Sequence, residues 1–383
     1  MNVKQYQLTL FFGRYKTRSA GVWVYSVELL NTLCELTQER KEIKDLIFPM
    51  RVVFSGLDEQ LEELEKIKMK YAELLIDIVR LENFKNHRKL GMVSDFFKRF
   101  NDTKILHGTA NVLPLFGRSK KILTLHDLFQ AYPVIELKGI YARLRVLVYR
   151  CLFFLQCKRA DMIVSDLSLV KESIEARYEI NNVYTVLPGL KSVYLNSPLP
   201  LVENKGQYLV AFAALDPRKN ITKVIQAFLN ERFLEDVSLK IVACSDTVKN
   251  KLDDFLETNN ISNIEVLTQV SDSEMQELYM NARGVVFPSL AEGFGFPIYE
   301  ALSQGVAVVA SSNLTIEQIR VEVRPFVIEC DPYSCESIGN AMQRVVSLIQ
   351  RAEKRQTVAS FVRKVLNFKN TAIHFVDLYK ALL

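Results

Sequence analysis

The sequence predicts an α/β protein built from two domains, each a doubly wound parallel sheet. Two observations predict this class. Short, β-rich apolar runs alternate with longer amphipathic stretches along the whole chain. The length of 383 residues also exceeds what one hydrophobic core normally serves. Because 49% of the residues are hydrophobic and 24% are charged, the composition is globular. Two domains with full cores are therefore expected.

Ten apolar runs are predicted as strands. In the first half they cover residues 7–12, 51–55, 104–107, 122–126 and 162–165. In the second half they cover residues 208–213, 239–244, 264–268, 284–288 and 307–310. Apolar residues at helical spacing predict amphipathic helices over 59–75, 170–177 and 274–282.

The domain boundary is expected at the polar, proline-bearing stretch 197–206, immediately before a strong strand. This gives a first domain over 1–196 and a second over 197–365. We expect residues 366–383 to form a helix that packs back on the first domain. Doubly wound domains bind ligands at the carboxyl ends of their strands, so a shared cleft is the expected site.

Charge and cysteine content limit the function classes. The net charge of +5 suits anionic ligands or an anionic membrane surface and does not require nucleic acid. The six cysteines form no CxxC motif, which indicates reduced thiols and a reducing compartment. The amino terminus lacks the pattern of a secretory signal. We expect a cytoplasmic protein that lies, at most, on a membrane surface.

The stretch 141–159 mixes five basic residues with large apolar ones. One interpretation is a helix that lies on an anionic membrane and reaches a lipid-linked acceptor. The other is a core helix of the first domain with its basic face in water. The sequence favours the core helix, because positive charges occur on both sides of the helix rather than on one.

The most informative segment is FPSLAEGFGFPIYEAL, residues 287–302. It reads as a strand, a turn that carries Glu292, and a helix that carries Glu300. Gly293 and Gly295 let backbone amides approach a ligand closely, and Pro297 suits a first helical turn. A helix that begins there offers free N–H groups and a positive dipole end to an anion.

A second segment, DPRKN at 216–220, also follows a strand. It places Arg218 and Lys219 at the carboxyl end of that strand. Fixed cations at such a position stabilise the charge that develops on a departing diphosphate. Each segment alone is a weak signal, because glycine turns and basic pairs are common in loops.

Taken together, the segments resemble the family 4 glycosyltransferases, which have the GT-B fold of two Rossmann-like domains facing a cleft. YLVAFAALDPRKNITKVIQAF resembles the opening of the family's donor domain, and FPSLAEGFGFPIYEALSQGVAVVASS resembles its E-x7-E donor site. The resemblance implies that Glu292 contacts sugar hydroxyls near the reacting carbon and that Lys219 and Arg218 bind the diphosphate. It further implies a donor site with contributions from Gly293, Phe294, Gly295, Phe296 and Pro297.

The same resemblance implies that Glu300 holds the ribose hydroxyls. The alternative for Glu300 is an exposed carboxylate in the first turn of the helix, where it favours the helix dipole.

In the first half, KILTLHDLFQAYP resembles a family segment that brings a histidine to the cleft. This implies a catalytic role for His126 and an acceptor contact for Asp127; from spacing alone, His126 would only cap a neighbouring element. Gly21 is retained from the family's glycine-rich loop and is expected to contact the donor. Trp23 departs from that pattern. It either stacks on the acceptor sugar or packs under the following helix, and the sequence does not decide between them.

The resemblance implies a retaining transfer of a sugar from a UDP- or GDP-linked donor to a hydroxyl of a saccharide or lipid-linked saccharide, in polysaccharide or glycan biosynthesis. No DxD triplet occurs, so neither a metal nor another cofactor is expected. The other interpretation is a GT-B-shaped nucleotide-sugar binder or epimerase that transfers nothing. The nucleotide, the sugar, the linkage and the oligomeric state are not determined by the sequence.

Overall fold

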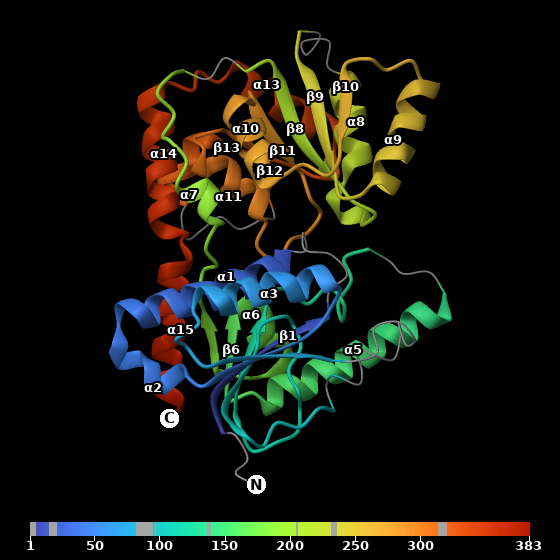
Figure 1. The fold of residues 1–383 in the computed structure, drawn as a ribbon. Helices are drawn as coiled ribbons and strands as arrows, with labels where there is room; N and C mark the ends of the chain where they lie inside the picture. Colours follow the sequence, from blue (N-terminus) through green and yellow to red (C-terminus); the bar gives the residue numbers. More distant parts are fainter. Residues whose placement is uncertain are drawn as a thin grey trace. The chain divides into compact units, whose positions relative to one another are not determined.

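The computed structural model describes residues 5–14, 21–81, 95, 97–135, 139–203, 206–230, 236–312 and 320–383. The chain forms two compact units (Figure 1). The first contains Met1–Gly189 together with Asn367–Leu383, and the second contains Leu190–Leu366. The boundary expected at residue 197 thus lies inside the second unit, shortly after its first residue. Each unit is described separately below.

The described part of the first unit holds a seven-stranded sheet in the order β3-β2-β1-β4-β5-β6-β7. Every neighbouring pair is parallel. The strands are β1 (Tyr6–Arg14), β2 (Met50–Ser55), β3 (Ile76–Arg80), β4 (Thr103–Gly108), β5 (Lys120–Leu125), β6 (Met162–Ser165) and β7 (Val183–Thr185). The five strands predicted in this half are present, and the edge strands β3 and β7 were not predicted.

Helices cover both faces of this sheet. One core cluster joins the strands to the helix α1 (Gly21–Glu39) and to α15 (Phe368–Leu382), which lie side by side (Figure 1). A second cluster joins them to α5 (Ile140–Arg159) and α6 (Ser168–Tyr178). The remaining described helices of this unit are η1 (Lys41–Ile43), α2 (Lys44–Ile47) and α3 (Asp58–Lys70). A parallel sheet buried on both faces is the doubly wound arrangement.

The helix α15 is integral to the first unit although it comes last in the chain. Phe368, Phe375 and Tyr379 are buried in the same core cluster as α1. The Tyr379 hydroxyl also lies 2.8 Å from Nδ1 of the buried His107, whose Nε2 lies 2.8 Å from Thr124 Oγ1. Burial and the nearby His126 lower the pKa of His107 to about 3, so this imidazole is neutral and structural.

The second unit has a six-stranded parallel sheet, within its described residues, in the order β10-β9-β8-β11-β12-β13. The strands are β8 (Tyr208–Ala213), β9 (Ser238–Ala243), β10 (Ile264–Leu267), β11 (Gly284–Phe287), β12 (Val308–Ser311) and β13 (Val327–Cys330). The five strands predicted in this half are present, and β13, an edge strand, was not predicted. The strand order reverses between β8 and β11, which is where doubly wound sheets bind ligands.

The helices of the second unit form two groups. α8 (Ile221–Asn230) packs against α13 (Cys335–Ser347), and α11 (Phe296–Ser303) packs against α14 (Ala352–Val365). The others are α7 (Ser192–Leu195), η2 (Pro217–Lys219), α9 (Asp246–Thr258), α10 (Asp272–Asn281), α12 (Arg320–Val323) and η5 (Arg324–Phe326). Helices α3, α6 and α10 match the three predicted from periodicity to within a few residues at each end.

Two further expectations from the sequence concern the state of the cysteines and the lack of a membrane-spanning helix. All six cysteines lie in the described part of the chain and are free thiols; Cys34, Cys157 and Cys330 are buried, whereas Cys151 and Cys244 are exposed. No described helix combines the length and the apolar character needed to cross a bilayer.

Candidate donor site and family membership

The candidate site lies at the carboxyl ends of β8 and β11, the adjacent strands at which the second sheet reverses its order. The loop after β8 runs into η2, and Asp216 caps η2 by accepting the Arg218 N–H at 3.0 Å. The chain then turns through Asn220 in the left-handed region, with φ of 59°, and enters α8. This turn leaves Lys219 close to the carboxyl end of β8.

Hydrogen bonds fasten the loop after β8 to the loop after β11. The Arg218 carbonyl accepts from the Leu290 N–H at 2.8 Å, and the Ser289 hydroxyl oxygen lies 2.9 Å from the same carbonyl. The Asn220 amide donates to the carbonyls of Pro288 and Pro332 at 3.0 and 2.7 Å. The two loops therefore form one connected structure, which holds the side chains that they carry in fixed positions.

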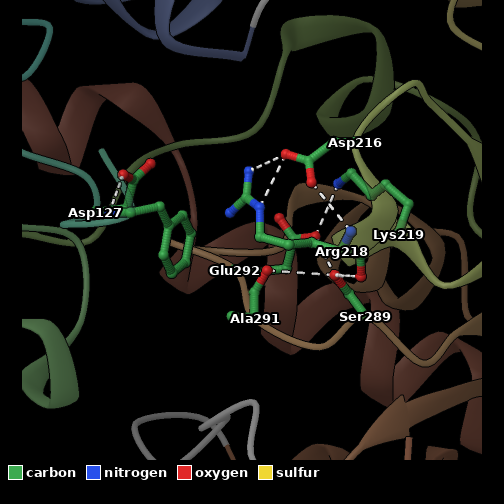
Figure 2. A network of polar contacts seen from close by, with 8 residues as sticks. Asp127, Asp216, Arg218, Lys219, Ser289, Ala291 and Glu292 are labelled. Carbon is green, nitrogen blue, oxygen red and sulfur yellow. Dashed lines mark hydrogen bonds and ion pairs between the residues drawn. The ribbon is translucent and has the colours of Figure 1, made fainter. Parts of the chain in front are cut away.

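An ion pair joins the two loops at the centre of the site. Lys219 Nζ lies 2.8 Å from Glu292 Oε1, which also accepts from the Ser289 hydroxyl at 2.6 Å (Figure 2). The ammonium lies 4.7 Å from the centre of the Phe287 ring, which favours the cation. The side chains of Lys219 and Glu292 are 26% and 14% exposed, so the pair is partly desolvated but open to a ligand. Sequence reasoning did not identify Ser289 or Asn220.

Arg218 is placed differently from Lys219. Its guanidinium contacts Asp216 Oδ2 through Nε at 2.9 Å and through Nη2 at 2.6 Å (Figure 2). Burial alone would raise the pKa of Asp216, but the hydrogen bonds and charge of Arg218 outweigh it and lower this pKa. Arg218 therefore stabilises the loop through Asp216 in this structure, and its predicted contact with a diphosphate stays a prediction.

The turn before α11 is built for a close backbone approach. Gly295 caps the helix with φ of 84°, a left-handed conformation that favours glycine. Phe294 is buried and stacks on Tyr299 at 4.3 Å between ring centroids, with Phe296 at 5.0 Å. None of the described groups accepts a hydrogen bond from the backbone N–H groups of residues 293–295. These donors precede a helix amino terminus, an arrangement that binds anions and polar oxygens.

Replacing Gly295 with alanine is expected to destabilise the second unit by about 1–2 kcal/mol, because an L-residue is strained in the left-handed region. The added Cβ would have only ordinary contacts, the nearest at 3.4 Å from Ile298 Cδ1, so strain and not collision is the cause. Urea unfolding followed by circular dichroism measures the change. Gly293→Ala is the matched control, since Gly293 is not among the glycines with positive φ. Equal stability of the two variants would contradict the assignment.

Glu300 lies on α11 but not in its first turn, which corrects the alternative considered for it from the sequence. One carboxylate oxygen accepts from the Tyr279 hydroxyl at 2.7 Å. Burial raises the pKa of Glu300, although the Tyr279 hydrogen bond and the charge of Lys191 oppose this. The predicted contact of Glu300 with a ribose stays a prediction.

His126 in the first unit is buried, with 6% of its surface exposed. Its Nδ1 lies 2.7 Å from Asp166 Oδ2, and its Nε2 lies 2.8 Å from the Thr109 carbonyl. Both partners are acceptors, so this arrangement favours the doubly protonated imidazolium form of the ring. Burial lowers the pKa of His126, but the charge and hydrogen bond of Asp166 outweigh it and raise this pKa.

Both ring nitrogens of His126 contact the protein in this structure, and the ring connects the segments that follow β4, β5 and β6. The catalytic role predicted for His126 stays a prediction. The neighbouring Asp127 is half-buried and accepts from the Phe129 N–H at 3.0 Å, and its acceptor role is untested. Sequence could not reveal that Asp166, which lies 40 residues further along, is the partner of His126.

Asp166→Asn is expected to destabilise the first unit by about 3 kcal/mol near pH 6, because it leaves a buried imidazolium without its counter-charge. The folded pKa of His126 is raised above its ordinary value of 6.5. The stabilisation is therefore complete below pH 6.5 and is lost as the pH rises through the folded value. The difference in the free energy of unfolding between wild type and the Asp166→Asn variant should therefore become smaller above neutral pH.

Fluorescence during urea unfolding measures this difference, since Trp23 is the single tryptophan of the chain and lies in the same unit. Asp45→Asn, at an exposed position of α2, is the control and should show no such narrowing. A pH-independent difference for Asp166→Asn would mean that His126 is neutral.

Trp23 belongs to the core, which excludes the acceptor contact and leaves packing as its role. The indole is 1% exposed and packs between Phe12 and Phe54, at 5.7 and 5.9 Å between ring centroids. Its N–H donates to Glu63 at 2.9 Å. Gly21 is the exposed first residue of α1, and its predicted donor contact is untested.

Comparison with known proteins relates the second unit to a known family. Residues 199–364 match the family described as "Glycosyl transferases group 1", and this range contains the whole site at the ends of β8 and β11. This part of the second unit is similar to the group 1 glycosyltransferases. The chain is 23% identical over 351 residues to the O-antigen chain mannosyltransferase RfbU of Salmonella typhimurium, covering 88% of this chain and 92% of that protein.

Solved structures of glycosyltransferases share the GT-B fold of this chain. The sucrose-phosphate synthase of Thermosynechococcus elongatus has a TM-score of 0.68 at 15% identity and covers 98% of each chain. Anabaena HepE, in complex with UDP and glucose, has a TM-score of 0.68 at 14% identity and covers 98% of this chain and 99% of its own. At these identities the likeness concerns the fold alone.

Proposed function

We propose that this glycosyltransferase moves a sugar from a UDP- or GDP-linked donor to a hydroxyl of a glycan acceptor, with retention of configuration, in polysaccharide or glycan biosynthesis. The observation that carries the proposal is the Lys219–Glu292 pair beside the backbone donors of residues 293–295, at the reversal point of the second sheet. A sugar diphosphate needs a cation for its phosphates and oxygen acceptors for its hydroxyls, and this site offers both.

The names of similar proteins support transfer of a hexose from a nucleotide-linked donor. RfbU is an O-antigen chain mannosyltransferase, which favours a hexose and a polysaccharide product. The HepE structure contains UDP and glucose, which favours a nucleotide-linked donor.

In the proposed reaction, the donor diphosphate replaces Glu292 as the partner of Lys219. The amides of residues 293–295 and the amino terminus of α11 add positive potential as charge develops on the leaving group. Glu292, released from the ammonium but still bonded to Ser289, accepts from the sugar hydroxyls near the reacting carbon. Lys219 and Glu292 thus neutralise each other until the donor arrives.

The bond changes follow from retention. The bond between the anomeric carbon and the phosphate oxygen breaks, and the acceptor hydroxyl bonds to the same face of that carbon. The hydroxyl proton passes to the departing phosphate oxygen, so a nucleoside diphosphate and the glycoside are the products. No protein nucleophile and no metal take part in this proposal.

The test is an incubation of the purified chain with UDP-, GDP- and ADP-linked hexoses, with and without a mannose-containing oligosaccharide. Mass spectrometry should show a product heavier by one sugar with one donor class, and NMR should show the anomeric configuration of the donor. Addition of EDTA should leave the rate unchanged. Epimerised donor without release of nucleoside diphosphate would mean an epimerase, and binding without any conversion would mean a donor-binding protein.

A further inference from the structure

Among the described residues, the carboxylate of Glu300 on α11 is bound through one oxygen only. The Tyr279 hydroxyl donates to Glu300 Oε2 at 2.7 Å, and Oε1 accepts no hydrogen bond from the part of the chain that the structure describes. Glu300 is half-buried, and Oε1 does not belong to the enclosed polar atoms that lack a partner. This oxygen therefore keeps contact with solvent and is able to accept from a ligand.

Tyr279 is a rigid anchor for that carboxylate. Its side chain lies on α10 and is fully buried. The ring packs against Tyr194 at 5.9 Å and against Phe212 at 6.2 Å, both measured between ring centroids. Because the ring cannot turn away without opening this core, its hydroxyl determines where the carboxylate of Glu300 lies.

The charged groups near Glu300 oppose one another. Burial raises the pKa of Glu300, the Tyr279 hydrogen bond and the charge of Lys191 lower it, and the charge of Asp272 raises it. Lys191 Nζ pairs with Asp272 Oδ1 at 2.6 Å, so the two charges act on Glu300 in opposite directions from one ion pair. Removal of the Tyr279 hydroxyl would therefore raise the pKa of Glu300 further.

A purely structural role for the Tyr279 hydroxyl has a direct comparison on the same helix. A buried tyrosine hydroxyl usually finds a hydrogen-bond partner, and a backbone carbonyl is sufficient. The Tyr208 hydroxyl meets this need by donating to the Leu278 carbonyl of α10 at 3.0 Å. Tyr279 instead donates to an ionisable side chain whose second oxygen is open, which is the arrangement of a ligand contact held from behind.

We propose that Tyr279 is a positioning residue for donor binding, whose hydroxyl fixes Glu300 so that Oε1 accepts from the vicinal hydroxyls of the donor's ribose. The inference rests on the proposed function, in which the ligand is a nucleotide sugar. A hydrogen bond to a charged acceptor is about twice as strong as a neutral one. A carboxylate that is fixed before the ligand arrives also loses less conformational freedom on binding.

Calorimetric titration with UDP, GDP and ADP tests the inference without any transfer. Each nucleotide is compared with its dideoxy analogue, which lacks both ribose hydroxyls. The wild type should bind its preferred nucleotide about a hundredfold more tightly than the analogue, at about tenfold for each hydroxyl. Tyr279→Phe should bind the nucleotide about tenfold more weakly than the wild type does, and the analogue with unchanged affinity.

Three further variants separate positioning from packing. Tyr208→Phe is the matched control, because it removes a hydroxyl that anchors α10 through the Leu278 carbonyl instead of through Glu300. It should keep the wild-type preference for the ribonucleotide. Glu300→Asp keeps the charge but withdraws the carboxylate from Tyr279, so the preference should be lost. Tyr279→Phe combined with Glu300→Gln should bind no more weakly than Glu300→Gln alone, because the hydroxyl acts through the carboxylate.

The pH dependence of binding is an independent readout. The preference for the ribonucleotide should decrease as the pH falls and Glu300 takes up a proton. Because Tyr279→Phe raises the pKa of Glu300, this decrease should begin at a higher pH than in the wild type, whereas Tyr208→Phe should not move it. The dideoxy analogue, measured in parallel, accounts for protonation of the phosphates.

An unchanged ratio of the two affinities in a folded Tyr279→Phe protein would overturn the inference and leave the proposed function in place. Retention of the preference by Glu300→Asp would contradict it as well, and this result does not depend on the folding of a Tyr279 variant. If the wild type binds none of the three nucleotides, the proposed function and the inference fail together.

Discussion

Lys219→Ala should lower the rate of sugar transfer about a thousandfold, the effect of removing one preorganised group that stabilises developing charge. The ammonium is held at the reversal point of the second sheet, between Glu292 and the Phe287 ring. In the proposed reaction it neutralises the departing diphosphate. Steady-state kinetics with a saturating donor measures the loss, which should fall mainly on kcat, because the charge develops in the transition state.

Two further variants test whether the loss of rate comes from the lost charge at position 219. Lys219→Arg keeps the positive charge and should recover part of the rate, whereas a purely structural lysine would show no such dependence on charge. Lys251→Ala removes an exposed lysine of α9 and should behave as wild type. Wild-type turnover by a folded Lys219→Ala protein would remove the basis of the proposed mechanism.

Glu292→Gln should lower transfer about a hundredfold to a thousandfold while leaving the fold intact. Glutamine keeps the shape of the side chain and an oxygen acceptor for Ser289, but it removes the negative charge. That charge balances Lys219 in the free protein and, in the proposed reaction, faces the sugar as positive charge develops at the anomeric carbon. Rates of transfer and of donor hydrolysis, measured by release of nucleoside diphosphate, report the loss.

The control for this variant is Glu257→Gln, at an exposed position of α9. A Glu292→Gln protein that binds donor as tightly as wild type but turns over slowly would place the carboxylate in the transition state. Unchanged turnover would show that hydrogen bonding alone is needed at this position and that the charge has no role.

The predicted and the missed strands differ in their position in the sheet and in how much surface they bury. All ten predicted strands exist, whereas β3, β7 and β13 were missed, and each of these lies at an edge of its sheet. Edge strands bury less surface: β3 ends in two exposed residues, and β7 contains the exposed Tyr184. A prediction from apolar runs finds strands that are covered on both faces, and it finds the edge strand β10 through its buried Ile264 and Val266, but it misses the other three edge strands.

The candidate site residues also differ in whether a local sequence pattern predicts them. Glu292 and Lys219 were predicted because a local pattern surrounds each, and their contact follows once β8 and β11 are neighbours. The roles of His126 and Trp23 could not be settled from the sequence, because their environments come from distant segments. His126 contacts Asp166 and Thr109, and Trp23 contacts Phe54 and Glu63. Burial of a single polar or aromatic residue depends on such contacts, which local sequence does not contain.

The place of α15 has a consequence for biosynthesis. The ribosome makes the strands of the first unit early, but Phe375 and Tyr379, which fill their core, are translated only after the whole second unit. The second unit has all its residues before α15 is made, so it is able to fold first. Until then the nascent first unit carries an open apolar seam along α1, where a chaperone would be expected to bind and where a premature stop codon would leave a chain unable to close its core.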